Sequence, residues 1–237
     1  MRIEAIRQSL LAAGARDCHL DRVLRAWTQG KPLDAGPRSQ PAEHYLPLAL
    51  RNALPDLEAQ LSGLALVRSE HPGEDGSARL LVELGDGQMV ESVLLPRDGL
   101  CVSTQVGCAV GCTFCMTGRD GLIRQLGSAE IVAQVVLGRH RRPVKKVVFM
   151  GMGEPAHNLD NVFEAIDLLG HEGGIGHKNL VFSTVGDQRV FERLEAIPAG
   201  GVKPALALSL HSTDPDLRAK LLPRAPQIGI EEMVERA

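Results

Sequence analysis

Aromatic residues are scarce in this chain of 237 residues, which has one Trp, one Tyr and five Phe. This scarcity argues against a surface that binds single-stranded nucleic acid by stacking bases on several aromatic side chains. The sequence also lacks any apolar run of about 18 residues, the length that a membrane-spanning helix needs. The first residues alternate charged and apolar positions and lack the uninterrupted apolar core of a signal peptide. We therefore expect no membrane association and a cytoplasmic location.

A strong net charge is also absent. The formal net charge is −3, so we expect no global attraction to nucleic acid, and any contact with RNA must come from local basic patches. The five cysteines are an odd number, and three of them fall within residues 108–115. In an intracellular protein, clustered cysteines are more typical of a metal or redox site than of a disulfide scaffold.

The first hundred residues differ in pattern from the rest. Apolar residues at helical spacing predict helices over residues 3–13, 19–28 and about 42–53, with a loop over residues 31–41. Two runs with strand character, 78–84 and 88–96, are joined by the Gly-Asp-Gly of residues 85–87 and predict a β-hairpin. We interpret residues 1–95 as an accessory module of helices and a β-hairpin, and as a candidate for RNA binding.

From Cys101 onward, apolar strands alternate with helices. The strands are predicted at residues 101–106, 145–151, 178–184 and 204–210. The helices are predicted at about 128–138, 159–170, 187–196, 214–221 and 230–236, with Ser128 and Asp214 as N-caps. Such alternation predicts parallel βα units. The predicted fold class is therefore α/β, with a partial (βα) barrel over residues 96–237.

The most specific chemical signal is Cys108-x3-Cys112-x2-Cys115, directly after the first of these strands. Three thiolates can hold three irons of a [4Fe–4S] cube and leave the fourth iron without a protein ligand. That open iron can chelate the amino and carboxylate groups of S-adenosylmethionine (SAM) and pass an electron to its sulfonium. The alternatives are a zinc site or buried free cysteines, although structural zinc usually takes four ligands that come in closely spaced pairs.

Three further motifs stand at the carboxyl ends of the next three strands. They are GMGEP (151–155), STVG (183–186) and SLHS (209–212). In βα barrels ligands collect at this face, where glycines expose backbone groups and Glu154 can hold an ammonium. The side chains of Ser183, Ser209 and His211 can bind carboxylate or ribose oxygens. Each motif alone is more often an ordinary turn, but together, beside the cysteine loop, they predict the SAM site.

The string CVSTQVGCAVGCTFCMTG (101–118), followed by MGMGEP, STVG and SLH, closely resembles the RlmN/Cfr family of radical-SAM RNA adenine methyltransferases. The resemblance covers roughly residues 89–237 and implies a radical-SAM barrel of six βα units, of which four are present here. It implies a [4Fe–4S] cluster, SAM, an RNA substrate (ribosomal, transfer or both) and an electron donor such as flavodoxin. It also implies methyl transfer to carbon 2 of an adenosine, with carbon 8 as the alternative. We expect a monomer.

The resemblance assigns roles to particular residues by position. The cluster ligands would be Cys108, Cys112 and Cys115, and the SAM site would comprise Gly153, Glu154, Ser183, Ser209, Leu210 and His211. Cys101 resembles the thiol that forms a transient disulfide with a methylated cysteine and releases the product. Glu91 matches the glutamate that accepts a proton. A buried packing role for Cys101 and a solvated role for Glu91 remain open as alternatives.

The resemblance also implies a segment that is absent from this sequence. In that family one SAM methylates a cysteine near the C-terminus, and a second SAM is cleaved to a radical that takes hydrogen from the new methyl group. This cysteine and an Asn of the SAM site would follow Ala237, and no cysteine here lies beyond Cys115. Four βα units that end on a helix also look incomplete. We therefore expect the chain to be a fragment of a longer enzyme.

Basic residues near these motifs are candidates for RNA contacts. Residues 139–146 carry six Arg, His and Lys side chains, but this segment joins a helix to a strand and should lie at the amino-terminal face as a solvated loop. Arg119 and Arg124 follow the cysteine loop and are better placed to contact phosphates. Two other functions remain open, namely a radical-SAM enzyme acting on a peptide or small molecule, and a non-catalytic iron–sulfur or zinc protein that binds RNA.

Overall fold

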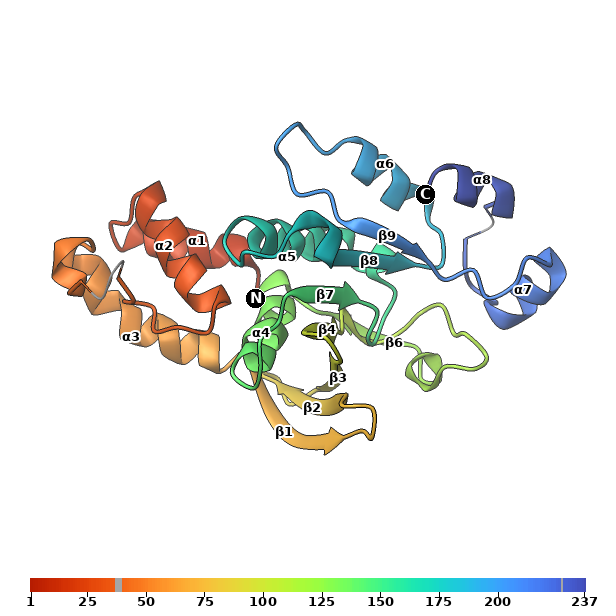
Figure 1. Cartoon of the computed structure of the whole chain (residues 1–237), viewed down its shortest axis with the longest axis horizontal. Coiled ribbons are helices and arrows are strands. Elements are labelled where there is room, and N and C mark those ends of the chain that lie inside the picture. Colours follow the sequence, from red (N-terminus) through yellow and green to blue (C-terminus); the bar gives the residue numbers. More distant parts are fainter. Residues whose placement is uncertain (37–39, 227) are drawn as a thin grey trace.

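The computed structural model describes residues 1–36, 40–226 and 228–237. Its centre is a seven-stranded sheet in the order β1-β2-β3-β4-β7-β8-β9. A module of three helices, α1 to α3, lies at one end of the molecule, and helices α7 and α8 lie at the other (Figure 1). The loop predicted over residues 31–41 includes residues 37–39, which lie outside the described residues.

The sheet combines two kinds of strand pairing. Its strands are β1 (Ala65–Pro72), β2 (Ala78–Leu84), β3 (Met89–Leu95), β4 (Gly99–Val102), β7 (Lys146–Phe149), β8 (Leu180–Thr184) and β9 (Ala205–Leu208). Strands β1 to β4 pair antiparallel, whereas β4, β7, β8 and β9 pair parallel. A separate antiparallel ribbon joins β5 (Gln105–Gly107) to β6 (Leu122–Gln125). The predicted parallel half-barrel and the predicted β2–β3 hairpin are both confirmed.

The helices follow the predicted alternation. They are α1 (Ile3–Ala12), α2 (Asp17–Thr28), α3 (Leu48–Ser62), α4 (Ser128–Arg139), α5 (Leu159–His171), α6 (Gln188–Glu195), α7 (Pro215–Leu221) and α8 (Ile230–Glu235). Short 3-10 turns occur at Ala42–His44, Met116–Gly118, Pro155–Asn158 and His177–Asn179. In the described part of the chain, none of the helices combines the length and the apolar character that crossing a membrane would require.

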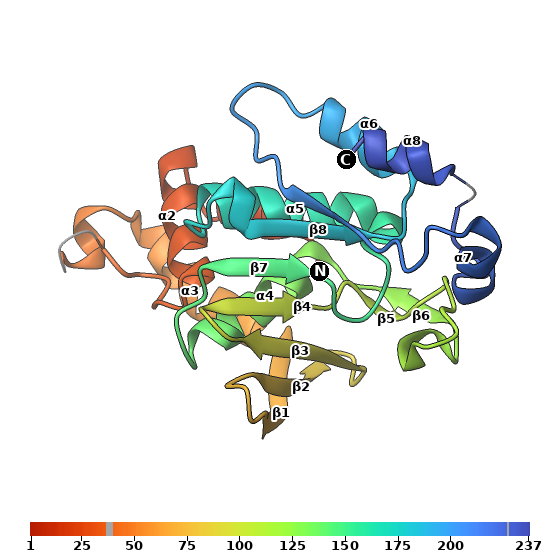
Figure 2. The ribbon, with the colours of Figure 1, turned by 45° about the vertical axis from the view of Figure 1, so that its right-hand side comes forward.

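The two faces of the parallel strands differ in burial. Leu100, Val102 and Phe149 alternate along their strands and are completely buried, because helices α4 and α5 cover that face (Figure 2). The alternate positions are only partly buried, and the register aligns two of them, Cys101 of β4 and Val148 of β7. The period-2 pattern of the strands therefore leaves one face of the sheet open.

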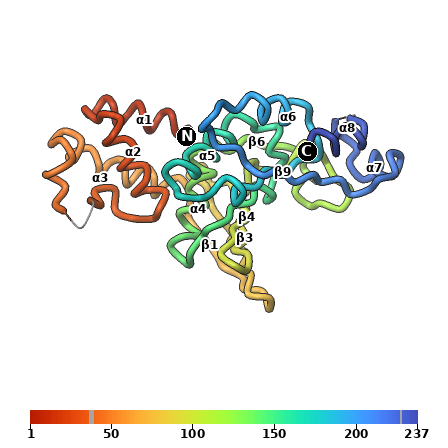
Figure 3. Tube along the Cα trace, turned by 45° about the horizontal axis from the view of Figure 1, so that its top comes forward, coloured from red at the N-terminus to blue at the C-terminus, as the bar shows by residue number. Residues whose placement is uncertain are grey.

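The predicted accessory module shares its sheet with the barrel. β3 pairs with β4 so that Val93 lies opposite Cys101, and the sheet continues across the predicted boundary between residues 95 and 96. Helix α1 is fastened to α4, where the Ile3 N–H donates to Ser128 Oγ (2.8 Å), and Ser128 Oγ donates to Glu164 (2.7 Å). Figure 3 shows α1, α2 and α3 grouped beside the sheet. The division of the chain at residue 95 remains a prediction.

The prediction of one continuous strand over residues 101–106 is wrong, because β4 ends at Val102 and β5 begins at Gln105, with two residues between them. At this break, the side-chain amide of Gln134 on α4 forms hydrogen bonds with both the N–H and the carbonyl of Ser103. Its Oε1 accepts from the Ser103 N–H (2.8 Å), and its Nε2 donates to the Ser103 carbonyl (2.9 Å). The Thr104 N–H donates to the carbonyl of Met152 (2.9 Å). The chain therefore leaves the sheet here, and the cysteine loop follows β5 instead of β4.

Smaller predictions also need correction. Asp214 caps α7 as predicted, but the cap of α4 is Gly127 and not Ser128, because the Gly127 N–H donates to Glu130 (2.7 Å) while the Ser128 hydroxyl is engaged with α1. The helix predicted from about residue 42 begins at Leu48, after a 3-10 turn. The outer strand β1 and the ribbon strand β6 were not predicted.

Candidate functional site

The three strand-end motifs meet at one edge of the sheet. The Gly151 N–H donates to the carbonyl of Val102 (3.0 Å), which joins the end of β7 to the end of β4. The Ser209 N–H donates to the carbonyl of Thr184 (2.8 Å), which joins the segment after β9 to the end of β8. The hydroxyl oxygens of Ser183 and Ser209 lie 3.2 Å apart. Parallel pairing thus gathers residues that are far apart in the sequence.

Glycine at position 153 is required by the backbone. Gly153 has a φ of +102°, and a Cβ there would lie 2.6 Å from the Cβ of Gln105. The close approach lets Gln105 Oε1 accept from the N–H of Glu154 (2.7 Å). The glycine therefore allows the turn after β7 to lie directly against the segment that leads to the cysteine loop.

Glu154 is the buried acid of the site. It is 5% exposed, its Oε1 accepts from the Ala156 N–H (3.2 Å), and its Oε2 accepts from the Val185 N–H (3.1 Å). Burial raises the pKa of this carboxyl to about 7, although hydrogen bonds from Thr184 and the two amides oppose the shift. A carboxyl group in this state can take up or release a proton near neutral pH, and it would favour a neighbouring ammonium.

The three cysteines lie on one loop and differ in exposure. Cys108 is buried, Cys112 is half-buried and Cys115 is exposed. Burial is the main cause of the raised pKa of the Cys108 and Cys112 thiols, and the nearby Glu154 and other thiols act in the same direction. At neutral pH the two thiols of the metal-free protein therefore keep their protons, and binding of a metal cluster would release these protons.

Backbone contacts hold this loop in place. The Cys108 N–H donates to the carbonyl of Gly121 (3.0 Å), and the Thr113 N–H donates to the carbonyl of Leu221 at the end of α7 (3.0 Å). At Gly111, where φ is +65°, a Cβ would lie 2.1 Å from Nη2 of Arg224. The end of α7 and the segment after it therefore pack against the cysteine loop and help to hold it in place.

The donor set fits a [4Fe–4S] cluster. Among the described residues, no three His, Cys, Asp or Glu side chains converge as they would around a single metal ion. A cube spaces its thiolates farther apart because each binds a different iron. The charges of Cys108 and Cys115 both act on Cys112, so the three thiols share one neighbourhood, with Glu154 beside it. When bound, the cluster would supply the electron for the reductive cleavage of SAM.

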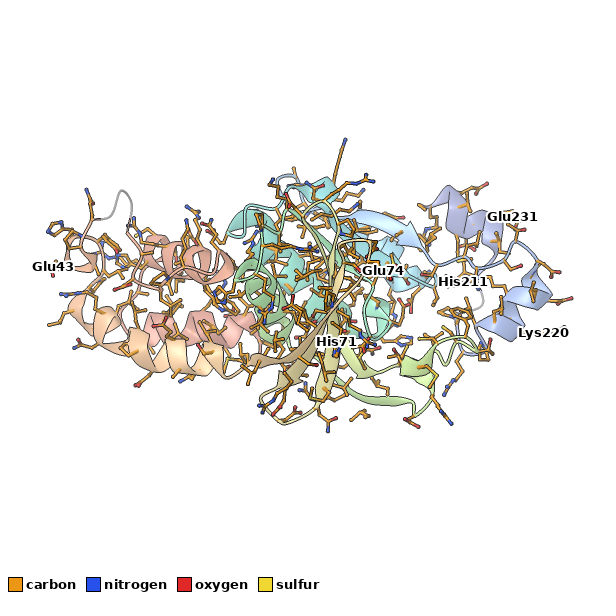
Figure 4. The ribbon with its side chains drawn as sticks, turned by 60° about the horizontal axis from the view of Figure 1, so that its bottom comes forward. Glu43, His71, Glu74, His211, Lys220 and Glu231 are labelled. Atoms are coloured by element: carbon orange, nitrogen blue, oxygen red, sulfur yellow. The ribbon has the colours of Figure 1, made fainter. Side chains whose placement is uncertain are left out.

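His211 also reaches the cysteine loop. It has a φ of +63°, unusual for a residue other than glycine, and its ring centroid lies 4.7 Å from that of Phe114. Leu210, before it, is half-buried. Figure 4 labels His211 near the start of the segment that leads to α7, with Lys220 farther out. The structure therefore brings the predicted SAM-site residues to the edge that carries the cysteines.

Three supporting residues were not predicted from the sequence. Asn158 donates from Nδ2 to the carbonyls of Thr104 (2.8 Å) and Leu126 (2.7 Å), which ties the turn after GMGEP to the β5–β6 ribbon. Arg218 of α7 is buried and donates to the carbonyl of Val185. Arg224 lies over Gly111. No pattern in the sequence marks these side chains, because their partners come from distant segments.

Cys101 and Glu91 occupy neighbouring strands. Burial raises the pKa of the Cys101 thiol to about 11. Glu91 lies two positions before Val93, the residue that pairs with Cys101, so Glu91 shares the face of β3 on which Val93 lies. Its carboxylate lies 3.3 Å from Nη1 of Arg79 and is partly exposed. All five cysteines are free thiols.

The basic residues that are candidates for RNA contacts lie in different environments. The Arg124 guanidinium lies 2.6 Å from a carboxylate oxygen of Asp86 and 2.8 Å from one of Glu130, so its charge is already paired, and its contact with a phosphate stays a prediction. Arg119 is exposed. The segment 139–146 is not simply a solvated loop, because Arg139 donates to three backbone carbonyls, those of Thr28, Val144 and Gly173.

Four parallel βα units with a three-cysteine loop, glycine-rich turns and a buried acid at their carboxyl edge define an iron–sulfur protein that binds an amino-acid-bearing ligand. The family model of the Radical SAM superfamily matches residues 102–237. A crystal structure of a radical SAM methyltransferase from Sphaerobacter thermophilus superposes with a TM-score of 0.75 at 31% identity, covering 100% of this chain and 70% of the other. The chain belongs to the radical SAM superfamily, as its sequence predicts.

Two curated relatives have a higher sequence identity to this chain than the crystallised methyltransferase has. A protein of Dechloromonas aromatica named "Probable RNA methyltransferase" is 73% identical over 237 residues, which is 100% of this chain and 66% of the relative. A protein of the same name from Stutzerimonas stutzeri is 73% identical over 235 residues, 99% of this chain and 68% of the relative. The chain therefore spans about two thirds of the length of the curated relatives it matches. These matches are consistent with the RlmN/Cfr resemblance.

Proposed function

We propose that this chain is the cluster- and SAM-binding part of an RNA methyltransferase that transfers a methyl group from SAM to carbon 2 of an adenosine in ribosomal or transfer RNA. The observation that carries the proposal is the meeting of the cysteine loop with the three strand-end motifs at one edge of the sheet. The names of the relatives support methyl transfer to RNA. The sequence resemblance allows carbon 2 or carbon 8, and the proposal takes carbon 2, with carbon 8 as the alternative.

The chain's own residues would bind and orient SAM. Cys108, Cys112 and Cys115 would ligate the cluster. Glu154 is held by two backbone amides, so its charge is fixed where an ammonium would lie. The paired hydroxyls of Ser183 and Ser209 can turn toward a carboxylate or ribose oxygen. Gly153, Leu210 and His211 would complete this site.

Cys101 and Glu91 would act in product release. Glu91 would accept the proton that leaves the adenine ring. The Cys101 thiolate would attack the sulfur of a methylene-bridged cysteine, so that an S–S bond forms, the carbon–sulfur bond breaks with its electron pair going to the methylene carbon, and that carbon takes up a proton to become the methyl group. Because burial raises the pKa of Cys101 to about 11, this attack requires a base or a change in its surroundings. Cytoplasmic location, monomeric state and the flavodoxin-like donor remain predictions.

The test uses the full-length protein that contains this chain. After anaerobic reconstitution it is incubated with reductant, isotopically labelled SAM and total RNA, and the digested nucleosides are analysed by mass spectrometry. Label in 2-methyladenosine is the expected result, and Cys112→Ala should lose it. Label in 8-methyladenosine would reassign the carbon, and no label in RNA would overturn the proposal.

The role of Cys101 has a separate readout. Cys101→Ala should leave SAM cleavage intact and accumulate protein covalently linked to RNA, visible on a denaturing gel. Cys18→Ala, which changes an exposed thiol on α2, is the matched control and should behave as wild type. Turnover of Cys101→Ala at the wild-type rate without adduct would leave Cys101 as a packing residue.

A further inference from the structure

A basic pocket lies at the amino-terminal edge of the parallel strands, away from the cysteine loop. Its volume is about 540 Å³, and it is formed by the end of α2, the loop from α4 to β7 and the glycines after α5. The basic side chains that line it are Lys31, Arg139, His140, Arg141, Arg142 and Lys145. No carboxylate belongs to its lining. The whole chain has a net charge of −3, so this concentration of cations is a local feature.

Several of these charges have no acidic partner. Arg139 donates to three backbone carbonyls, and Arg142 donates to the carbonyls of Gly76 (2.9 Å) and Leu95 (2.7 Å). Carbonyl groups hold a guanidinium in place without cancelling its charge. Lys31 is exposed, and its ammonium group makes no hydrogen bond or ion pair with any described residue. The walls are therefore fixed cations that attract an anion.

Three acidic groups around the basic pocket are already engaged in ion pairs. Arg141 lies 3.0 Å from Glu70, and Lys145 lies 2.8 Å from Asp98, both outside the lining. Glu172, at the end of α5, lies 2.8 Å from Arg25. After these pairs are counted, Lys31, Arg139 and Arg142 remain uncompensated. The Gly174 N–H, at the same edge, donates to no backbone carbonyl of the described residues and offers a neutral donor.

An apolar pocket of about 460 Å³ adjoins the basic one. It lies between α2, α3, β1 and α4, and its apolar lining includes Trp27, Leu33, Leu61, Ala65 and Val136. Lys31 and His140 line both pockets, so the two spaces share a border. The side chains of Glu58 and Ser62 provide hydrogen-bonding groups on the wall of the apolar pocket. Both volumes fall in the range of about 300–1,000 Å³ that is typical of small-ligand sites.

We propose that the two pockets together bind a nucleotide unit of the RNA substrate, with the base in the apolar pocket and the phosphates in the basic pocket. A flat, largely apolar ring joined to anionic groups is the chemistry that such a pair of pockets complements. Glu58 can accept a hydrogen bond from an exocyclic amino group of a base, and Lys31 can reach toward the phosphate at the border. The site is separate from the edge at which SAM would bind.

The proposal rests on the proposed RNA substrate and deepens it. An RNA chain contacts a methyltransferase over many nucleotides, and cations remote from the reacting adenosine add affinity through phosphate contacts. A free nucleotide offers the same chemistry, so the test must separate the two sources. The pockets join the helical module to the barrel, so a nucleotide bound there would contact both parts.

Trp27 provides the readout, because it is the only tryptophan of the chain and lines the apolar pocket. We would titrate the protein, without SAM or reductant, with a single-stranded oligoribonucleotide of about 12 residues. Parallel titrations would use 5′-AMP and inorganic phosphate. Trp27 emission should change on RNA binding and saturate. Lys31→Gln and Arg141→Gln should each weaken binding several-fold and lower the slope of log affinity against log salt by about 1.

Lys178→Gln is the matched control, since Lys178 is an exposed cation at the same edge of the sheet and lines neither pocket. It should bind RNA as wild type does. Lys31→Gln removes no internal contact, so it remains decisive even if Arg141→Gln loosens the loop through its pair with Glu70. Circular dichroism confirms that each variant is folded.

Three outcomes would overturn the site. RNA binding without a Trp27 response, or with wild-type affinity in Lys31→Gln, would show that RNA binds elsewhere and would leave the proposed function standing. Saturation of the Trp27 response by 5′-AMP, without competition from the oligoribonucleotide, would assign the pockets to a free nucleotide. Failure of the titrated wild-type protein to bind any RNA would count against the proposed function itself.

Discussion

At the scale of single residues, Gly111 couples the cysteine loop to the segment after α7. A Cβ at Gly111 would lie 2.1 Å from Nη2 of Arg224, the end of a flexible side chain that would have to move, and the φ of +65° strains the loop backbone with any residue other than glycine. Gly111→Ala should therefore displace the loop and lower the iron and sulfide content after reconstitution. Gly14→Ala is the control, because Gly14 also has a positive φ, +83°, but has open space around its Cβ position. Equal iron content in both variants would contradict this account.

The raised pKa of the buried Glu154 carboxyl predicts how the free energy of unfolding depends on pH. Burial raises its pKa from an ordinary value of 4.5 to about 7. Between these values the folded protein keeps a proton that the unfolded chain releases, so the free energy of unfolding falls as the pH rises from about 4.5 to about 7. A shift of this size corresponds to about 3 kcal/mol. Glu154→Gln cannot titrate, and it should lose this part of the pH dependence.

Urea unfolding of the metal-free protein at a series of pH values measures this effect. Glu74→Gln serves as the comparison, because Glu74 lies on an exposed turn between β1 and β2 (Figure 4) and should leave the profile unchanged. If Glu154→Gln keeps the wild-type slope between pH 4.5 and 7, the carboxyl is not the protonated group in the folded state.

At the scale of elements, helix α7 supports the cysteine loop through its last residue. Asp214 caps the helix, and its Oδ1 accepts from the N–H groups of Asp216 (2.9 Å) and Leu217 (3.2 Å). Asp214→Ala should lower the free energy of unfolding by about 0.5–2 kcal/mol. The Thr113 N–H donates to the carbonyl of Leu221, so it should exchange with deuterium faster in this variant. Asp214→Asn retains a capping oxygen and should resemble wild type. Unchanged exchange at Thr113 would show that the loop is held without α7.

At the scale of the whole molecule, the sheet and the core continue across the predicted boundary between residues 95 and 96. Strand β4 pairs with β3 on one side and β7 on the other, and α4 packs against α2 and β1. A fragment of residues 96–237 would lose β3 as a partner and uncover the side of α4 that faces α2, α3 and β1, where Ala133 and Val136 are buried. We therefore expect this fragment to lack a cooperative thermal transition by far-UV circular dichroism, in contrast to the full chain. A sharp transition in the fragment would show that residues 96–237 fold independently.

The sequence by itself determined the superfamily, the parallel βα pattern and the placement of the candidate site. The cysteine spacing lies within one loop, and each strand-end motif lies within five residues, so local order specifies both. Apolar periodicity is local too, and it located β2, β3, β7, β8 and β9, whereas it merged β4 and β5 into one strand. Parallel pairing then brings the carboxyl ends of these strands together without further information.

Only the tertiary structure decided which hydrogen-bond and ion-pair partners the polar side chains have. The break between β4 and β5 depends on Gln134, which lies 31 positions beyond Ser103 in the sequence. Arg124 is held by Asp86, 38 positions away, and Arg139 by the carbonyl of Thr28, 111 positions away. The type of a residue fixes the charge and the hydrogen-bonding groups of its side chain, but the fold decides which partners lie close to it. That is the physical reason why the sequence located the cysteine loop but did not reveal that the basic segment forms the wall of a pocket.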